Sequence, residues 1–151
     1  MATTVTPATL TTTISESITL NGVTYDKTTT KSIASVAVYS STVHQLKGNT
    51  THAIVNFVSD PTSGRFDTED FKYMRITNLD DTNAVNISLT DASDAAVGFQ
   101  LNAGESFILS ALNIDANTSG SALTTLDHLV ETANIRTGAN ETDVEIVIAT
   151  A

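Results

Sequence analysis

The chain has 151 residues and a formal net charge of −10 at pH 7, from 17 acidic and 7 basic residues. This length predicts one ordinary domain with a real core, and the lack of any Lys/Arg cluster argues against nucleic acid or an anionic membrane as a partner. The chain has no cysteine, which excludes disulfides, thiolate catalysis and cysteine-based zinc sites.

The composition favours β-structure. Hydrophobic residues make up 40% of the chain and charged residues only 16%, and Thr, Ser and Asn fill the difference. Threonine is β-branched and suits a pleated, half-exposed sheet better than a helix. We therefore expect an all-β protein.

The first segment, residues 1–13, is rich in Thr, carries no charge and contains Pro7. We predict an extended N-terminal arm, which either pairs with a neighbouring subunit or frays as a free terminus. It lacks the basic and apolar regions of a secretory signal, and no run approaches transmembrane length, so a soluble chain is expected. Residues 14–151 are predicted to form a single β-sandwich domain.

The first strong local signal is Asn21-Gly22, the dipeptide most typical of a tight β-hairpin turn. It predicts a hairpin after Ile14, with a bulge or loop at 26–30. The apolar stretch 52–59 then reads as a strand that ends in a Pro- and Gly-containing turn at 60–64.

The next strand is expected to begin at about Phe71. One face carries Tyr73 and Arg75 and the other carries Met74 and Ile76. Neither face is purely apolar, so we expect this strand to be partly covered on both sides.

Two further patterns follow along the chain. Val85, Ile87 and Leu89 alternate with polar residues, as in a half-buried strand. Two more strands are predicted to join at residues 102–104, with Phe99 and Leu101 facing the pair that follows, Phe107 and Leu109.

The C-terminal part holds one ambiguity. Leucines in 123–137 fall near a helical period, and a strand through 129–135 is the competing interpretation. A final strand is expected where Val144, Ile146 and Ile148 alternate with other residues. Because turn signals recur roughly every 8 to 12 residues, we expect one antiparallel, jelly-roll-like β-sandwich of about eight strands, with a short helical turn at most.

The acidic segment Asp80-Asp81-Thr82-Asn83 is the first candidate site. A calcium loop of the EF-hand type requires a glycine at its sixth position and a distal glutamate, and this window has no glycine. Asp and Asn also suit tight turns, because their side chains accept hydrogen bonds from nearby backbone N–H groups. We interpret the segment as the turn of a hairpin, with an adventitious cation as the alternative.

The second candidate is the loop that carries Asp67, Glu69 and Asp70 beside Arg65 and Lys72. Paired carboxylates can hydrolyse glycosides, but such enzymes also need a cleft with aromatic residues. The chain has no Trp and only 5% aromatics, so a solvated loop is favoured.

The remaining candidates are the scattered histidines, His44, His52 and His128, which form no metal-binding motif. The chain also lacks GxSxG and GxG motifs. We therefore expect no catalytic, cofactor-binding or metal-binding residues, and a protein that is not an enzyme.

Three stretches carry a resemblance: "KYMRITNLDDTNAVNISLT", "FQLNAGESFILS" and "DVEIVIATA". They resemble small virion structural proteins of tailed bacteriophages, especially those of the marine cyanophage type, from about Ile14 to the C-terminus. A strand of the form I-x-N-x-x-x-x-x-V-x-I-x-L precedes an L-x-A-G-E-S-F-x-L hairpin, here Leu101 to Leu109. The resemblance implies a location in the virion, a structural role without catalysis, and partners on the capsid or tail.

These observations leave three hypotheses. The first is a capsid decoration or cement protein that acts as a homo-oligomer, as a trimer or in many copies, and uses the arm to add a strand to a neighbour. Its partner is expected to be a neutral or mildly basic protein surface. The second is a tail-fibre, knob or host-recognition module, although Tyr25, Tyr39 and Tyr73 are too few and dispersed for a binding patch. The third is a glycan hydrolase that uses the Asp67 loop.

Overall fold

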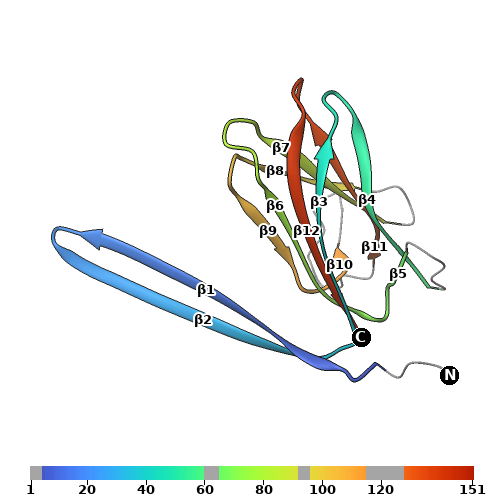
Figure 1. Cartoon of the computed structure of the whole chain (residues 1–151), viewed down its shortest axis with the longest axis horizontal. Coiled ribbons are helices and arrows are strands. Elements are labelled where there is room, and N and C mark those ends of the chain that lie inside the picture. The colour runs from blue at the N-terminus through green and yellow to red at the C-terminus, as the bar shows by residue number, and fades with distance from the viewer. Residues whose placement is uncertain (1–4, 60–64, 92–95, 115–127) are drawn as a thin grey trace.

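The computed structural model describes residues 5–59, 65–91, 96–114 and 128–151. These residues form strands and no helix (Figure 1). The strands are β1 (Ala8–Leu20), β2 (Val23–Val36), β3 (Val38–Leu46), β4 (Thr51–Val58), β5 (Phe66–Asp67), β6 (Phe71–Asn78), β7 (Val85–Asp91), β8 (Ala96–Leu101), β9 (Ser106–Leu109), β10 (Asn113–Ile114), β11 (His128–Thr137) and β12 (Thr142–Thr150). The predicted all-β fold is confirmed.

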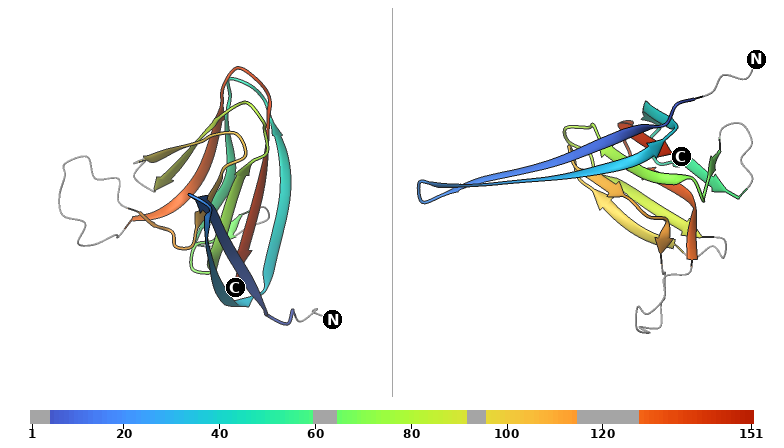
Figure 2. Two further views of the ribbon diagram at one scale, coloured as in Figure 1. Left: turned by 90° about the vertical axis from the view of Figure 1, so that its left-hand side faces the viewer. Right: turned by 90° about the horizontal axis from the view of Figure 1, so that it is seen from below.

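The body of the molecule is two sheets packed face to face (Figures 1 and 2). One sheet has the order β3-β12-β6-β9, and the other has the order β5-β4-β11-β7-β8, with β10 added beside β11. All pairings are antiparallel except that of β4 with β5. This arrangement agrees with the expected antiparallel sandwich.

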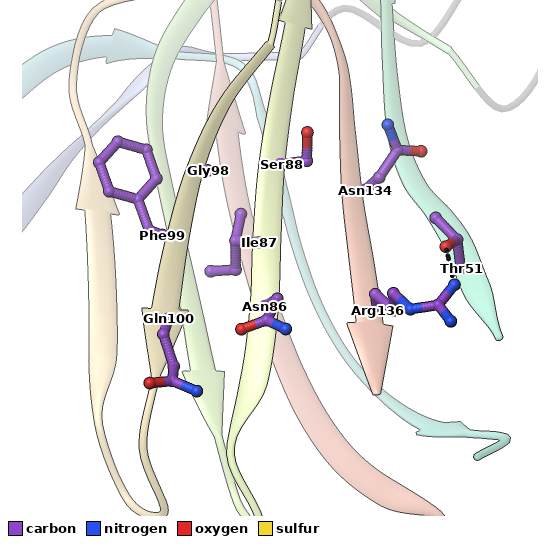
Figure 3. Close-up of a pocket in the computed structure, with 9 residues that line it drawn as sticks. All are labelled: Thr51, Asn86, Ile87, Ser88, Gly98, Phe99, Gln100, Asn134 and Arg136. Carbon is purple, nitrogen blue, oxygen red and sulfur yellow. Dashed lines mark hydrogen bonds between the residues drawn. The ribbon is translucent and has the colours of Figure 1, made fainter. Parts of the chain in front are cut away.

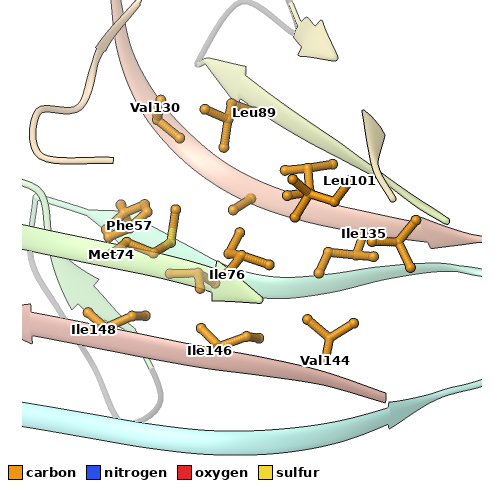
Figure 4. Packing of buried hydrophobic residues seen from close by; sticks show 14 of the residues in the cluster. Phe57, Met74, Ile76, Leu89, Leu101, Val130, Ile135, Val144, Ile146 and Ile148 are labelled. Carbon is orange, nitrogen blue, oxygen red and sulfur yellow. The ribbon is translucent and has the colours of Figure 1, made fainter. Parts of the chain in front are cut away.

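The core lies between the two sheets and draws on both (Figure 4). From β7 it takes Val85, Ile87 and Leu89, the three residues whose alternation predicted a buried face. Val144, Ile146 and Ile148 of β12 face them from the opposite sheet. Because alternate residues of a strand point to opposite faces, these two patterns fix which side of each sheet is covered.

Strand β6 is covered on both sides, as predicted. Met74 and Ile76 are fully buried in the main core. Tyr73 points the other way and is also buried, in a second cluster on the outer face of the sheet.

The segment around residues 102–104 differs from the expected hairpin. Strand β8 pairs with β7 and β9 pairs with β6, so the chain crosses from one sheet to the other at this point. The Phe99 and Phe107 rings nevertheless stack, with centroids 5.0 Å apart and planes 29° apart. The two rings therefore contact each other between the two sheets, and not as neighbours on paired strands of one hairpin.

The ambiguous C-terminal segment is a strand within its described part. Residues 128–137 form β11, so the helical interpretation is wrong there. Strand β11 lies between β4 and β7, so its backbone N–H and C=O groups form hydrogen bonds with both neighbouring strands. A helix uses these groups for its own hydrogen bonds and cannot take this position. The rest of the segment, to residue 127, and the predicted turn at 60–64 lie outside the described residues.

The N-terminal region forms a long hairpin, β1 with β2, that projects away from the sandwich (Figures 1 and 2). We call Ala8–Val36 the arm. The expected boundary between residues 13 and 14 falls inside β1, so the projecting element reaches much further along the chain than the sequence indicated. The Asn21-Gly22 turn is confirmed, with φ of 50° and 79°, as a tight turn with two left-handed residues requires.

The bulge or loop expected at 26–30 is wrong, because the register runs unbroken from the Leu10/Ile33 pair to the Leu20/Val23 pair. The irregularity lies at the base of the arm, between Ala8 and Leu10, where Ser35 has φ of 58°. An extra residue in one strand reverses the alternation. Ile33 and Val36, which an unbroken strand would place on opposite faces, are therefore buried in the same cluster.

Candidate functional site

The arm has two chemically different faces. Its register places alternate residues of both strands on one side, and there every side chain is a hydroxyl or a carboxylate. This polar face consists of Thr11, Thr13, Ser15, Ser17, Thr19, Thr24, Asp26, Thr28, Thr30 and Ser32.

Side-chain hydrogen bonds cross the polar face between register partners. Ser17 donates to the Asp26 carboxylate at 2.5 Å, and the hydroxyls of Thr19 and Thr24 are 3.0 Å apart. Such pairs stabilise a two-stranded ribbon that has no third strand. The two strands of the polar face are therefore linked to each other by their side chains as well as by the backbone.

The opposite face of the arm is mostly apolar. It carries Leu10, Ile14, Ile18, Leu20, Val23, Tyr25 and Ile33, with Thr12, Glu16, Lys27, Thr29 and Lys31 between them. Among the described residues, the sandwich covers only the base of this face, where Leu10 and Ile33 pack against the outer face of the β3-β12-β6-β9 sheet. Beyond the base the large apolar side chains are exposed, including Ile18 at 54% and Tyr25 at 57%.

A groove of about 550 Å³ lies in the angle between the arm and this sheet. Leu10 and Ile14 line it from the arm, and Tyr39, Tyr73 and Ile108 line it from the sheet. Burial raises the pKa of the Tyr73 hydroxyl, the charge of Arg75 opposes this rise, and Tyr39 adds to it. The groove thus continues the apolar face of the arm onto the sandwich.

Charge separates the arm from the rest of the chain. The arm holds two acidic residues, Glu16 and Asp26, and two basic residues, Lys27 and Lys31. The formal charge of −10 therefore belongs entirely to the remainder of the chain. The arm therefore exerts no net electrostatic attraction or repulsion on a partner, whereas the sandwich repels an acidic partner.

The acidic segment 80–83 is a structural turn. The Asp80 carboxylate accepts hydrogen bonds from the backbone N–H of Thr82 at 2.8 Å and of Asn83 at 2.7 Å, and these bonds lower its pKa. It joins β6 to β7, which lie in different sheets, so the expected hairpin is wrong here although the expected turn is present. Within the described residues no group of three or more acidic or histidine side chains could hold a metal ion.

Asn78, which the sequence analysis did not single out, holds this end of the sandwich together. Its buried amide donates to the backbone carbonyls of Asn83 at 2.8 Å and Asn102 at 3.1 Å. Its side-chain oxygen accepts from the Asp80 backbone N–H at 3.1 Å. One side chain therefore ties together the two loops that cross between the sheets.

The other candidate residues remain apart from one another. Asp67 ends β5, and Glu69 and Asp70 lie in the turn that follows it. Asp67 accepts a hydrogen bond from the Glu69 backbone N–H at 2.8 Å, a local turn contact. His44 lies on β3 and His52 on β4, in different sheets. His128 begins β11.

A concavity of about 540 Å³, lined by both polar and apolar groups, lies on the outer face of the other large sheet (Figure 3). It forms where Gly98, which has no side chain, pairs with Ser88. Amide, hydroxyl and guanidinium groups surround it, from Thr51, Asn86, Ser88, Gln100, Asn134 and Arg136. Arg136 donates to the Thr51 hydroxyl at 3.3 Å, and the one aromatic residue along its edge, Phe99, stacks on Phe107 instead.

Comparison with family models, curated proteins and solved structures finds no match to this chain. Among the described residues no helix is long and apolar enough to cross a membrane. Among the described residues, the arm and its groove carry most of the large exposed apolar side chains. The sequence contained a signal for the arm, because hydroxyl residues, with Asp26 among them, occupy every second position on both sides of Asn21-Gly22.

Proposed function

We propose that the protein is an accessory structural component of a phage virion that decorates or cements a repeating protein lattice. The observation that carries this proposal is the apolar face of the arm, which extends from the sandwich into solvent. Its tip carries a cluster of exposed large apolar side chains, Ile18, Leu20, Val23 and Tyr25, and such exposed clusters are typical of protein interaction sites. A lattice offers the same groove between subunits many times, and a projecting hairpin can fill one such groove per copy.

The charge distribution indicates which part of the molecule makes the contact. The sandwich, with all the net charge, stays in solvent, and the neutral arm enters the partner. Burial of its apolar residues then drives binding at roughly 25 cal/mol per Å² of apolar surface. The partner surface is accordingly apolar, with a neutral or mildly basic rim.

We also propose that the sandwich is a jelly roll. In support, the eight principal sandwich strands (β3, β4, β6, β7, β8, β9, β11 and β12), numbered one to eight in chain order, follow the orders 1-8-3-6 and 2-7-4-5 in the two sheets. Two interlocked Greek keys produce these orders, and viral capsid and lectin domains use such folds. The fold fits a virion protein by analogy only, because folds host many functions.

The test uses virions that lack the protein, to which purified chain is added before sedimentation. Ile18→Ser with Tyr25→Ser should lower the bound copy number roughly tenfold or more, because both side chains lose apolar surface. The matched control is Thr19→Ala with Thr24→Ala, a register pair on the polar face, which should bind like wild type. Binding that is equally strong in the apolar-face variant would contradict the proposal, as would antibody label confined to the tail.

A second candidate function is recognition of a host surface as part of a tail fibre or knob. The concavity on the outer face of the other sheet favours it, since its amide and guanidinium groups can hydrogen-bond to carbohydrate hydroxyls. Host-cell or glycan binding that Arg136→Ala and Asn134→Ala abolish would support this function. Binding to the virion head without any glycan binding would exclude it.

A further inference from the structure

Strand β3 is an open edge of its sheet. It ends the order β3-β12-β6-β9, and within the described part of the chain its only ladder partner is β12. The ladder runs without a break for nine residues, from Val38 to Leu46. Seven of these nine residues are exposed, so nothing described covers the strand.

Edge strands of this length usually carry a device that prevents pairing with another chain. Common devices are a charged side chain, a proline, a bulge or a very short strand. Strand β9, at the other edge of the same sheet, has only four residues. Strand β3 has neither a charged residue nor a proline, although the sandwich as a whole is strongly acidic.

We propose that β3 is a pairing surface for a second copy of this chain, antiparallel and about a two-fold axis that passes beside Ser41. Ser41 then lies opposite Ser41 of the second copy, and Tyr39 lies opposite Val43 of the second copy. Tyr39 and Val43 share the outer face of the sheet and are 58% and 62% exposed. An aromatic residue opposite a β-branched one is a favourable cross-strand pair.

The remaining side chains of β3 match under the same register. Ser40 and Thr42, which point to the other face, lie opposite each other in the two copies, so hydroxyl meets hydroxyl. Charge also favours a second copy, because two acidic sandwiches approach with least repulsion along a strip that carries no charge. An isologous contact of this kind is the commonest way in which identical chains associate.

The pairing deepens the proposed function but does not depend on it. A two-fold axis perpendicular to the joined sheet keeps both outer faces on the same side, so both arms project from one face of the dimer. Two arms that engage one lattice bind far more tightly than one, because the second contact is intramolecular. The sequence led us to expect a trimer or an assembly of many copies, and this two-fold contact differs from a trimer.

Analytical ultracentrifugation of the full chain tests the proposal without any virion. Wild type should show a concentration-dependent dimer, and Val43→Glu should raise the dissociation constant roughly tenfold or more, because it removes the apolar contact with Tyr39 of the second copy and places a carboxylate against that ring. Ile108→Glu, at an exposed apolar position on the opposite edge strand, is the matched control and should leave the dimer intact. Unchanged thermal melting would show that both variants are folded.

The register is tested by cross-linking, which the lack of native cysteine makes unambiguous. With a short bismaleimide, Ser41→Cys should give a covalent dimer, and Gln45→Cys, far from its own copy in this register, should not. A wild-type protein that stays monomeric, or a dimer that forms equally well with Val43→Glu, would overturn the proposal. Loss of lattice binding with an intact dimer would instead count against the proposed function alone.

Discussion

Ile18 and Tyr25 are register partners across the arm, and each leaves more than half of its surface in solvent. Ile33, on the same face near the base, is buried against the sandwich. The same apolar face is thus a packing surface at one end and a free surface at the other.

This difference predicts unequal effects of truncation. Ile33→Ala should lower the free energy of unfolding by about 2 kcal/mol, because it leaves a cavity beside Tyr73 and Val147. Ile18→Ala should change it by less than about 0.5 kcal/mol, since an exposed side chain loses little on truncation. Urea denaturation of the two variants measures the difference, and equal values would mean that the arm is not anchored at its base.

Asn78→Ala should destabilise the sandwich by about 1–3 kcal/mol, because several backbone groups of the two crossing loops lose their partner. Asn86→Ala, at an exposed position, serves as the control. Urea denaturation measures both. A loss below about 0.5 kcal/mol for Asn78→Ala would show that water replaces the amide without cost.

Thr142 and Thr137 give a matched pair of buried hydroxyls. The Thr137 hydroxyl donates to the Lys47 carbonyl at 2.8 Å, whereas the Thr142 hydroxyl has no hydrogen-bond partner among the residues described. Thr142→Val should therefore stabilise the protein by up to about 1 kcal/mol, and Thr137→Val should destabilise it by about 1 kcal/mol. Thermal melting would reveal opposite shifts, and shifts of the same sign would contradict the assignment.

Stability should fall in acid partly through the loop end of the sandwich. Hydrogen bonds from Thr82 and Asn83 lower the pKa of Asp80, and those from Asn102 lower the pKa of Glu105. In acid the unfolded chain therefore binds more protons than the folded one. The two carboxylates stabilise the folded protein fully above their ordinary pKa, and this stabilisation is lost as pH falls through their lowered pKa values.

The Asp80→Asn, Glu105→Gln variant should lose less stability than wild type between about pH 5 and pH 2. The measurement is the free energy of unfolding in urea at constant ionic strength. Identical pH profiles for variant and wild type would show that these two groups do not contribute.

Strand positions were predictable where one face meets the core. Val85, Ile87 and Leu89 alternate because β7 lies on the core, and β12 follows the same rule. Sheet partners were not predictable, since nothing local distinguishes a hairpin from a crossing between sheets. The residue types at 102–104 suit a hairpin turn and a crossing between sheets equally well. Only the pairing of β8 with β7 and of β9 with β6 shows that the chain crosses here.

The arm was underestimated for a related reason. Its apolar face alternates like that of a buried strand, so residues beyond 13 were assigned to the sandwich. Alternation reports that one face is apolar and does not report what covers it. Asn78 could not be identified either, because its partners are backbone atoms from loops far apart in the sequence.

The position of β12 in its sheet has a consequence for biosynthesis. It lies between β3 and β6, and it also supplies Val147 and Ala149 to the cluster that anchors the arm. The ribosome makes β12 after every strand that it joins. Until β12 appears, β3 is not joined to the β6-β9 pair, and the base of the arm lacks the packing contacts that β12 supplies. Such late closure through distant contacts slows folding, and it leaves the apolar residues of the arm available to chaperones throughout translation.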